Sequence, residues 1–395
     1  MLSAHAPGGT NAASRRLADV SNPSALASAD TQSPEQFYVL RRSVHDDLIA
    51  AVYRQRGYLC AEASVAAEIS GEAAWHGIRT HNGIKALDVE AKHGSRIGGC
   101  NPGAAIRRRA GRFESSEVWD AQRKLGQPVA LEAINTCMRL AERFGIGQVS
   151  VDNAFHYLWG GAYVLHAAKH GYIAYTNCTS TCAEVVPHLG KTPTLGTNPH
   201  SWAFPTQDLL GYPILVDWAT SVIAWGRVTQ CAREGRPLPA GAALDAEGRP
   251  TTDPSLARSL LPFGGHKGYG LSLINEIMAA YIGGSVPTRR DHWEIPGAKP
   301  ASCFYFQAIH PESLSAGSFA GGKTQSGNVQ EVLRDILAHG NASCRLPGQF
   351  EAEAAARSRR NDGLLFTAAE ISRLNEFAAE GGSPPINENE LPLAL

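Results

Sequence analysis

The amino-acid sequence predicts an α/β protein with some α+β character. Segments with helical periodicity alternate with short apolar runs along most of the chain, as in folds that cover a sheet with helices. The 40 glycines indicate many tight connections between these elements. With 395 residues, the chain is long enough for two or three domains with substantial cores, and it shows no internal repeat.

Composition and charge narrow the function classes. Hydrophobic residues make up 43% of the chain, charged residues make up 18%, and the formal net charge is -1. This balance gives no electrostatic reason to expect a nucleic-acid partner or an anionic membrane surface. The longest apolar run, 212–226, is interrupted by Asp217 and is too short to span a bilayer. The eight cysteines form no CxxC pair, so we expect reduced thiols and a cytoplasmic protein.

The first half of the chain shows alternating helix and strand signals after a polar start. Residues 1–34 are rich in Ala, Ser, Asp and Pro and poor in large apolar side chains, which is typical of a disordered tail. Apolar residues then recur at helical spacing or in short runs. These patterns predict helices over 34–77, 131–144 and 162–168, and strands over 148–151 and 172–175.

The second half continues this alternation. The apolar run 214–220 predicts a strand, whereas 233–254 is polar and punctuated by Pro and Gly, which indicates an exposed loop. A strand over 303–309, a helix over 329–338 and a charged helix over 351–361 are expected to follow.

A glycine-rich segment, 260–270 (LLPFGGHKGYG), contains one His and one Lys, His266 and Lys267. The residues after it recur at helical spacing and predict a core helix that ends at Gly283-Gly284. Its expected buried face consists of Leu271, Ile274, Ile277, Met278 and Tyr281. A loop of this kind that opens a helix favours anions, because free backbone N–H groups and the helix dipole both attract negative charge. A simple tight connection into a core helix fits the local pattern equally well.

Two nucleotide-binding motifs can be tested directly. No G-x-G-x-x-G follows a predicted strand, so the usual dinucleotide fingerprint is absent. A literal Walker pattern runs from Gly317 to Gly322-Lys323-Thr324, but 310–316 separates it from the preceding strand. In a nucleotide triphosphatase this loop follows its strand directly. A phosphate-binding NTPase that uses Lys323 and Thr324 therefore remains as a competing class.

Two further polar features carry possible chemistry. His166 and His170 lie four residues apart on a predicted helix, a spacing that can hold a metal, but no third ligand is evident. We therefore expect no metal site there. Asp217 interrupts an apolar strand, and a carboxylate in that position needs a partner. It either orients a histidine, contacts a ligand or marks the end of the strand.

Several blocks together resemble one enzyme family. Segment 262–268 (PFGGHKG) is similar to a signature of the malate/L-lactate dehydrogenase family, whose members lack a Rossmann fold. Six further blocks agree in order, namely 119–123 (WDAQR), 153–161 (NAFHYLWGG), 171–173 (GYI), 195–199 (LGTNP), 216–221 (VDWATS) and 345–348 (RLPG). The resemblance covers roughly residues 40 to 365. It implies a central cofactor domain, 116–264, inserted in a mostly helical domain built from 35–115 and 265–395.

The resemblance also implies a proton donor near the end of the first helical region. The family's Gly-Ile/Val-x-Ser-His-Gly is matched by 77–82, which makes His81 the proton donor, with His76 as the alternative. In this register Thr80 replaces the Ser and keeps a hydroxyl that can orient the imidazole. Lys85 stands where the family usually has an Arg, and Asn82 replaces the Gly.

The remaining functional residues follow from the other blocks. His156 matches the family's second histidine, which contacts substrate, and Asp217 matches an aspartate that lines the cofactor site and can polarise the catalytic histidine. The resemblance implies contacts to NADH or NADPH at Cys178, Asp217, Trp218, Ala219, His266, Lys267, Gly348, Gln349 and Phe350.

The expected activity is hydride transfer at C2 of a small carboxylate substrate. Hydride transfer to a carbonyl or imine builds negative charge on oxygen or basicity on nitrogen, which a positioned imidazole can neutralise. Lys85 would bind the substrate carboxylate as a point charge. A 2-oxo or 2-hydroxy acid and a cyclic imino acid both remain open as substrates. The family also implies a homodimer. The departures from the family pattern at Asn82 and Trp218 leave open a protein that has lost catalytic activity and binds the cofactor without turnover.

Overall fold

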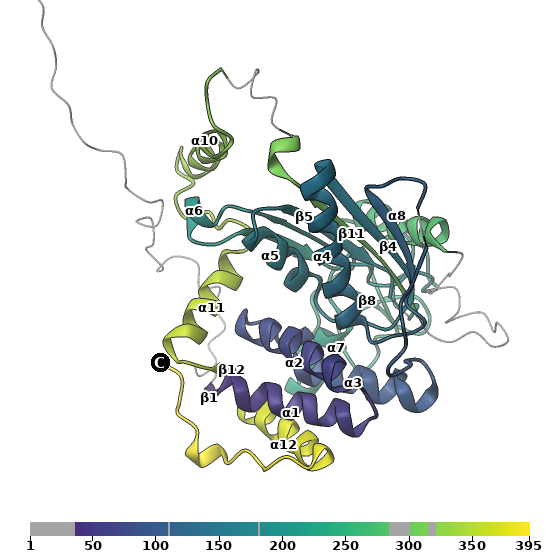
Figure 1. Ribbon diagram of the computed structural model, residues 1–395. Helices are drawn as coiled ribbons and strands as arrows, with labels where there is room; N and C mark the ends of the chain where they lie inside the picture. The colour runs from purple at the N-terminus through teal and green to yellow at the C-terminus, as the bar shows by residue number, and fades with distance from the viewer. Residues whose placement is uncertain (1–35, 110, 181, 284–300, 315–320) are drawn as a thin grey trace, which may run out of the picture.

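The computed structural model describes residues 36–109, 111–180, 182–283, 301–314 and 321–395. Within these ranges a seven-stranded mixed sheet carries helices on both faces, and further helices form a layer beside it (Figure 1). This arrangement confirms the predicted mixed α/β fold class. The expected tail lies outside the described residues.

The sheet brings together strands from distant parts of the chain. Its order is β2 (Arg107–Arg109), β3 (Ser116–Asp120), β4 (Ile146–Ala154), β11 (Ser302–Ile309), β5 (Ile173–Cys178), β6 (His200–Phe204) and β7 (Ile214–Trp218). The pair β3–β4 is parallel, and the other pairs are antiparallel. Side chains alternate across β11, so Phe304 and Phe306 enter the core while Tyr305 faces the opposite side.

Three helices cover the two faces of the sheet. Helices α4 (Gly126–Phe144) and α5 (Gly160–Lys169) pack on the face that carries the main core, and α8 (His266–Ile282) lies across β4 and β11 on the other face (Figure 1). The apolar stripe of α4 explains its position, because Ala133, Cys137 and Ala141 recur at helical spacing and are fully buried. The predicted helix over 131–144 is thus confirmed, although it begins earlier.

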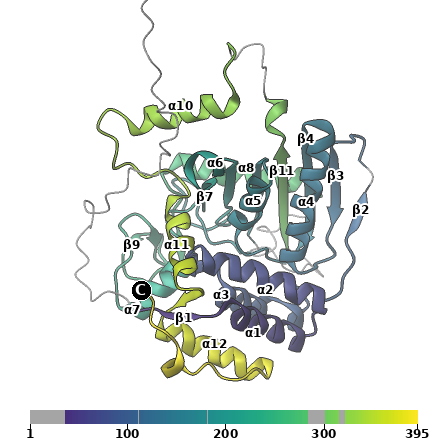
Figure 2. The same ribbon diagram turned by 60° about the vertical axis from the view of Figure 1, so that its left-hand side comes forward.

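The helical layer is built from both ends of the described chain. It consists of α1 (Arg42–Gln55), α2 (Cys60–Trp75), α3 (Gly83–His93) and α12 (Ala368–Gly381), together with β1 (Tyr38–Leu40) paired to β12 (Leu364–Phe366) (Figure 2). Helix α2 contacts α4 and so joins this layer to the sheet. Helices α6 (Gln207–Leu210), α7 (Trp225–Glu234), α10 (Gln325–Leu337) and α11 (Gln349–Arg360) complete the set.

The predicted domain boundaries do not coincide with the boundary between sheet and helices. Strand β11 belongs to the segment 265–395, yet it lies between β4 and β5 in the centre of the sheet. Strand β2 also lies outside the predicted cofactor domain and pairs with β3. The two predicted domains therefore share one sheet.

The prediction of an exposed loop over 233–254 is wrong for its central part. Leu238, Ala243 and Leu244 are buried, and β8 (Ala243–Leu244) pairs with β9 (Pro250–Thr251) and β10 (Ser259–Leu260). Pro and Gly correctly indicated turns, but the few apolar residues between them pack into a small cluster with Val185 and Val228. A satellite core of this size leaves little periodic signal in a sequence.

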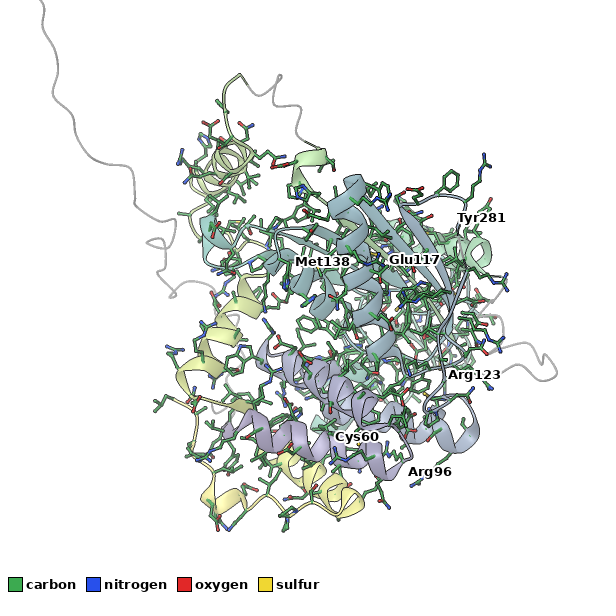
Figure 3. All side chains as sticks on the ribbon, in the orientation of Figure 1. Cys60, Arg96, Glu117, Arg123, Met138 and Tyr281 are labelled. Atoms are coloured by element: carbon green, nitrogen blue, oxygen red, sulfur yellow. The ribbon has the colours of Figure 1, made fainter. Side chains whose placement is uncertain are left out.

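The predicted buried face of α8 is also wrong. Gly268, Ser272, Asn275 and Ala279 face the protein, whereas Ile274, Ile277 and Tyr281 are exposed. Asn275 is buried because its Nδ2 donates to the backbone oxygens of Cys178 (3.0 Å) and Pro199 (3.2 Å). These small and polar residues allow the close approach, so the apolar row remains at the surface. In Figure 3 the Tyr281 side chain projects outward from the edge of the molecule.

Two findings bear on membranes and disulfides. In the described part of the chain, no helix combines the length and apolarity needed to cross a membrane. All eight cysteines are free thiols.

Candidate active site

A short 3-10 turn, η2 (Arg79–His81), connects α2 to α3 and presents His81. Thr80 Oγ1 lies 3.0 Å from His81 Nδ1, so the hydroxyl fixes the orientation of the ring and leaves Nε2 for another partner. Asn82 caps α3, because its side-chain oxygen accepts from the backbone N–H groups of Ile84 (3.1 Å) and Lys85 (3.4 Å). The asparagine therefore has a structural role at the start of the helix that carries Lys85.

His156 comes from the segment that follows β4 and lies opposite His81. The two imidazole rings are nearly parallel, with centroids 6.4 Å apart and planes inclined by 10°. The backbone N–H of Leu158 donates to His156 Nδ1 at 3.0 Å, so a neutral His156 carries its proton on Nε2. The structure thus brings together the two histidines that the sequence assigned to separate blocks.

Burial and positive charge both disfavour protonation of this pair. Desolvation, reinforced by Lys85, lowers the pKa of His81 to about 4. Desolvation also lowers the pKa of His156 to about 3, with further contributions from His81, Lys85 and His93. Both rings are therefore neutral near pH 7 in the free protein. An anionic ligand beside them would raise both pKa values, because it would stabilise the imidazolium form.

His76 occupies a different environment. It caps α2, its Nδ1 donates to the backbone oxygen of Glu72 at 2.8 Å, and its ring lies 5.7 Å from that of Trp159. Within the described residues, neither a ring contact nor a hydrogen bond joins His76 to His156. The structure pairs His156 with His81 and leaves His76 against Glu72 and Trp159.

Asp217 sits near the end of β7 and is held by two donors. Ser201 Oγ donates to its Oδ1 at 2.5 Å, and Trp159 Nε1 donates to its Oδ2 at 2.9 Å. The residue is accessible at the surface, but the protein atoms around its carboxylate limit hydration and raise its pKa to about 6. Across the described ranges, its hydrogen bonds go to Ser201 and Trp159 and to neither histidine. The role of Asp217 in polarising the catalytic histidine therefore stays a prediction, with no direct contact among the described residues to support it.

Ser201 and Trp159 were not singled out from the sequence as site residues. Trp159 falls in the 153–161 block, and its position two residues after Tyr157 gave no indication that its indole reaches β7. Ser201 lies opposite Asp217 in the β6–β7 register, and cross-strand neighbours of this kind cannot be read from one sequence.

The glycine-rich segment is joined to the chain just beyond β7. Phe263 N donates to Thr220 O at 3.0 Å, and Val222 N donates to Leu261 O at 2.9 Å. A Cβ added at Gly268 would lie 2.5 Å from Thr220 O, so only glycine permits this approach. These contacts hold side by side the two segments on which the sequence predicts cofactor residues. His266 and Lys267 are exposed in the first turn of α8.

Trp218 and Cys178 differ in what they offer a ligand. Trp218 stacks on His200 with centroids 5.5 Å apart, and its Nε1 is buried with no hydrogen-bond partner among the described residues. Such an atom calls for an acceptor that the described chain does not supply. Cys178 is buried, and burial raises the pKa of its thiol to about 12. Ala219 is half-buried. It directly precedes Thr220, whose backbone oxygen accepts from Phe263 N of the glycine-rich segment.

The C-terminal cofactor residues approach β7 from the side. Gly348 has a φ of 87°, and a Cβ there would lie 2.7 Å from Leu215 N, so its backbone packs closely against β7. Gln349 and Phe350 begin α11, and Phe350 is exposed. Glu351, one residue further along α11, contributes to the raised pKa of Asp217.

The other sequence motifs do not form a comparable site. Lys323 forms an exposed ion pair with Glu331 at 2.8 Å, and Thr324 caps α10 by accepting from Gly327 N at 3.0 Å. Gly317 of the Walker pattern lies outside the described residues. His166 Nε2 contacts Asn135 Oδ1 at 2.8 Å. No cluster of three or more potential metal-binding His, Cys, Asp or Glu side chains occurs in the described part of the chain.

Comparison with known proteins points to one family. Residues 42–375 match the family model described as malate/L-lactate dehydrogenase. A Delta(1)-pyrroline-2-carboxylate/Delta(1)-piperideine-2-carboxylate reductase from Pseudomonas syringae pv. tomato is 35% identical over 66% of this chain and 74% of its own. An L-sulfolactate dehydrogenase from Methanocaldococcus jannaschii is 30% identical over 87% of this chain and 97% of its own.

Solved structures of the same kind superpose on the fold. The sulfolactate dehydrogenase from Methanocaldococcus jannaschii gives a TM-score of 0.72 at 28% identity, covering 89% of this chain and 99% of that chain. The delta1-piperideine-2-carboxylate reductase from Pseudomonas syringae gives a TM-score of 0.73 at 29% identity, covering 86% and 99%.

Proposed function

Because the chain belongs to the malate/L-lactate dehydrogenase family and is a dehydrogenase or reductase, we propose that it transfers hydride to or from C2 of a small 2-oxo or 2-hydroxy acid, with NADH or NADPH as cofactor. The observation that carries this proposal is the stacked pair His81 and His156, with the positive charge of Lys85 near enough to lower the pKa of both rings. A cyclic imino acid is the alternative substrate of the same site, as in the reductase from Pseudomonas syringae.

In this proposal His81 is the proton donor for reduction and the proton acceptor for oxidation. The Thr80 hydroxyl holds its ring, and Nε2 faces the reacting oxygen or nitrogen. Lys85 binds the substrate carboxylate, and that negative charge raises the pKa of His81 toward the working pH. Substrate binding and protonation of the donor are therefore coupled. His156 contacts the substrate from the opposite side.

The cofactor residues fit a dinucleotide. The buried Trp218 Nε1 has no acceptor among the described residues, and Gly264 lies in the turn before α8, whose first residues, His266 and Lys267, are exposed. A bound nicotinamide supplies the hydride, and these residues with Asp217 and Ala219 hold it. In this proposal, Gly348, Gln349 and Phe350 form the part of the cofactor site that comes from the C-terminal segment. Cys178 contributes to the proposed cofactor site through its position at the end of β5, because its thiol is buried.

We further propose a homodimer in the cytoplasm. The row of exposed apolar side chains on α8, namely Leu273, Ile274, Ile277 and Tyr281, suits burial against a second copy. The eight free thiols favour a reducing compartment.

The test mixes purified full-length protein with NADH or NADPH and a panel of 2-oxo acids and cyclic imino acids, and follows nicotinamide absorbance. Oxidation of the reduced cofactor with at least one substrate supports the proposal. Cofactor binding by fluorescence without turnover of any substrate would instead identify a cofactor-binding protein that has lost catalytic activity. Binding of Mg-ATP that is lost in Lys323→Ala, together with no response to either nicotinamide, would instead support the NTPase.

A further inference from the structure

His156 lies in a segment, 152–158, whose backbone is held along a second segment, 120–126. Three backbone hydrogen bonds join the two segments, namely Ala121 N to Asp152 O (2.9 Å), Arg123 N to Asn153 O (2.6 Å) and Phe155 N to Lys124 O (3.0 Å). A Cβ at Gly126 would collide with the backbone oxygen of His156, so the start of α4 also packs directly against the histidine. The place of His156 therefore depends on segment 120–126.

Both segments contain backbone conformations that are uncommon for residues with a Cβ. The φ angles are 54° at Gln122, 60° at Arg123, 57° at Asn153 and 75° at Leu158. A left-handed backbone is unfavourable for such residues and persists only where surrounding contacts impose it. Asn153 and Leu158 flank His156, and Leu158 N makes the one hydrogen bond that the imidazole has among the described residues. The contacts that impose these conformations thus also place the ring.

One carboxylate connects the two segments. Asp120, the last residue of β3, accepts from Asn153 Nδ2 at 3.2 Å, across from the end of β4. It also accepts from Gln122 N at 2.9 Å and from the side-chain amide of Gln122. Hydrogen bonds to an ionised carboxylate are stronger than those between neutral groups. Asp120 therefore fixes one left-handed residue in each segment.

The far side of segment 120–126 is already held by the loop that follows α3. Asn101 N donates to Arg123 O at 2.8 Å, and Asn101 Nδ2 donates to Gln122 O at 3.0 Å. Figure 3 places Arg123 where the sheet meets the helical layer. Segment 120–126 is thus anchored to the helical layer, and the Asp120 carboxylate extends this anchorage to the segment that carries His156.

Resting on the function proposed above, we propose that Asp120 is a positioning residue for the reaction: through Asn153 it holds the segment that carries His156 and keeps this ring opposite His81. Across the described ranges, the hydrogen bonds of Asp120 go to Gln122 and Asn153, and it contacts neither ring. Without the carboxylate, Asn153 Nδ2 and Gln122 N lose their shared acceptor. The left-handed residues then relax and His156 leaves its place, while the sheet and helices persist.

The first experiment measures kcat and KM of full-length Asp120→Ala with a 2-oxo or cyclic imino acid that the unmodified enzyme turns over. We expect KM to rise at least about tenfold, because a small displacement of a substrate-contacting group is costly. Cofactor affinity by fluorescence should stay close to normal. Asp120→Asn retains one acceptor oxygen and should recover part of the loss. A normal KM in Asp120→Ala contradicts the proposal.

Asp245→Ala is the matched control for this substitution. Asp245 closes the turn between β8 and β9 in the same way, by accepting from Glu247 N at 3.0 Å and Arg249 N at 2.9 Å. Its loss removes a comparable set of hydrogen bonds from another part of the chain. KM in Asp245→Ala should therefore equal that of the unmodified enzyme, and an equal rise in both variants would overturn the inference.

The second experiment tests whether Asp120 acts through His156. In a His156→Ala background, Asp120→Ala should lower kcat/KM far less than it does when His156 is present, because residues that act as one unit are not additive. Additive losses would show that Asp120 supports the fold in general and would overturn the inference.

The third experiment follows His156 without turnover. Diethyl pyrocarbonate modifies accessible neutral imidazoles, and peptide mass spectrometry gives the rate at each histidine. Asp120→Ala should raise the rate at His156 at least about threefold, because release of the segment increases local opening. The rate at His76, whose ring is held by Glu72 O at 2.8 Å, should stay unchanged. An unchanged rate at His156 overturns the inference, whereas absence of turnover in the unmodified protein, with this rate raised, counts only against the proposed function.

Discussion

The rings of His81 and His156 lie 6.4 Å apart and are inclined by only 10°, although one belongs to the helical layer and the other follows a strand of the sheet. A proton on one ring disfavours a proton on the other, because two like charges at this distance in a poorly hydrated site repel each other. The pair can therefore hold one proton far more readily than two. In the proposed hydride-transfer step, only one of the two rings therefore carries the proton. His81 is the proposed donor, and His156 contacts the substrate.

The first prediction concerns which histidine is the proton donor. His81→Ala should lower kcat by roughly 100-fold or more, because general acid–base catalysis contributes at least that much. Cofactor affinity, followed by fluorescence, should change little, since the proposed cofactor residues lie on other segments. His76→Ala is the control, because His76 packs against Trp159 instead. A large loss of kcat in His76→Ala with near-normal His81→Ala would reverse the assignment.

The second prediction is the pH dependence of oxidation of a 2-hydroxy acid at saturating cofactor. With a pKa of about 4, His81 stays neutral and able to accept a proton well below pH 6.5. The value of kcat/KM should therefore remain level from pH 8 down to about pH 5, where an unperturbed imidazole would already be largely protonated. In the direction of reduction the protonated form is needed, so kcat/KM should rise as pH falls.

Lys85 provides the internal check on this profile. Its positive charge lowers the pKa of His81, so Lys85→Met should move the acidic limb of the oxidation profile to higher pH and raise KM. An acidic limb near pH 6.5 in the unmodified enzyme would show that His81 is not the group that titrates in the free protein.

The third prediction tests the close contact beneath the glycine-rich segment. Gly268→Ala places a Cβ 2.5 Å from Thr220 O and 2.6 Å from Phe263 O, so the backbone must shift at a cost of about 1–3 kcal/mol. We expect a lower Tm and weaker cofactor binding. Gly270→Ala is the matched control, because nothing lies within 4 Å of its Cβ and alanine favours the helix. Equal Tm values for the two variants would show that the loop relaxes freely.

Sequence patterns predicted the elements whose burial is strictly periodic. The alternation in β11 and the helical stripe of α4 each report one buried face, so their existence and type followed from spacing alone. Spacing failed at α8, because the pattern shows which residues share a face but not which surface covers that face. Asn275 is buried through two backbone acceptors, Cys178 at the end of β5 and Pro199 just before β6, which are distant in sequence.

The candidate site was predictable only in part for a similar reason. His81, Thr80 and His156 could be named from the blocks around them, and the structure brings them together. The partners of Asp217 could not be named, because Trp159 and Ser201 reach it across the fold.

The last prediction concerns the exposed apolar row on α8 and the proposed homodimer. Ile277 is 50% exposed and lies in the middle of this row, so Ile277→Lys places a charge where a second copy would exclude water. Sedimentation should show a dimer for the unmodified protein and a monomer for this variant. Val332→Lys on α10 is the control, because Val332 is 58% exposed, also β-branched and helical, and α10 lies on the opposite side of the sheet from α8 in Figure 1. A monomer before any substitution, or a dimer that persists in Ile277→Lys, would show that α8 does not form the subunit interface.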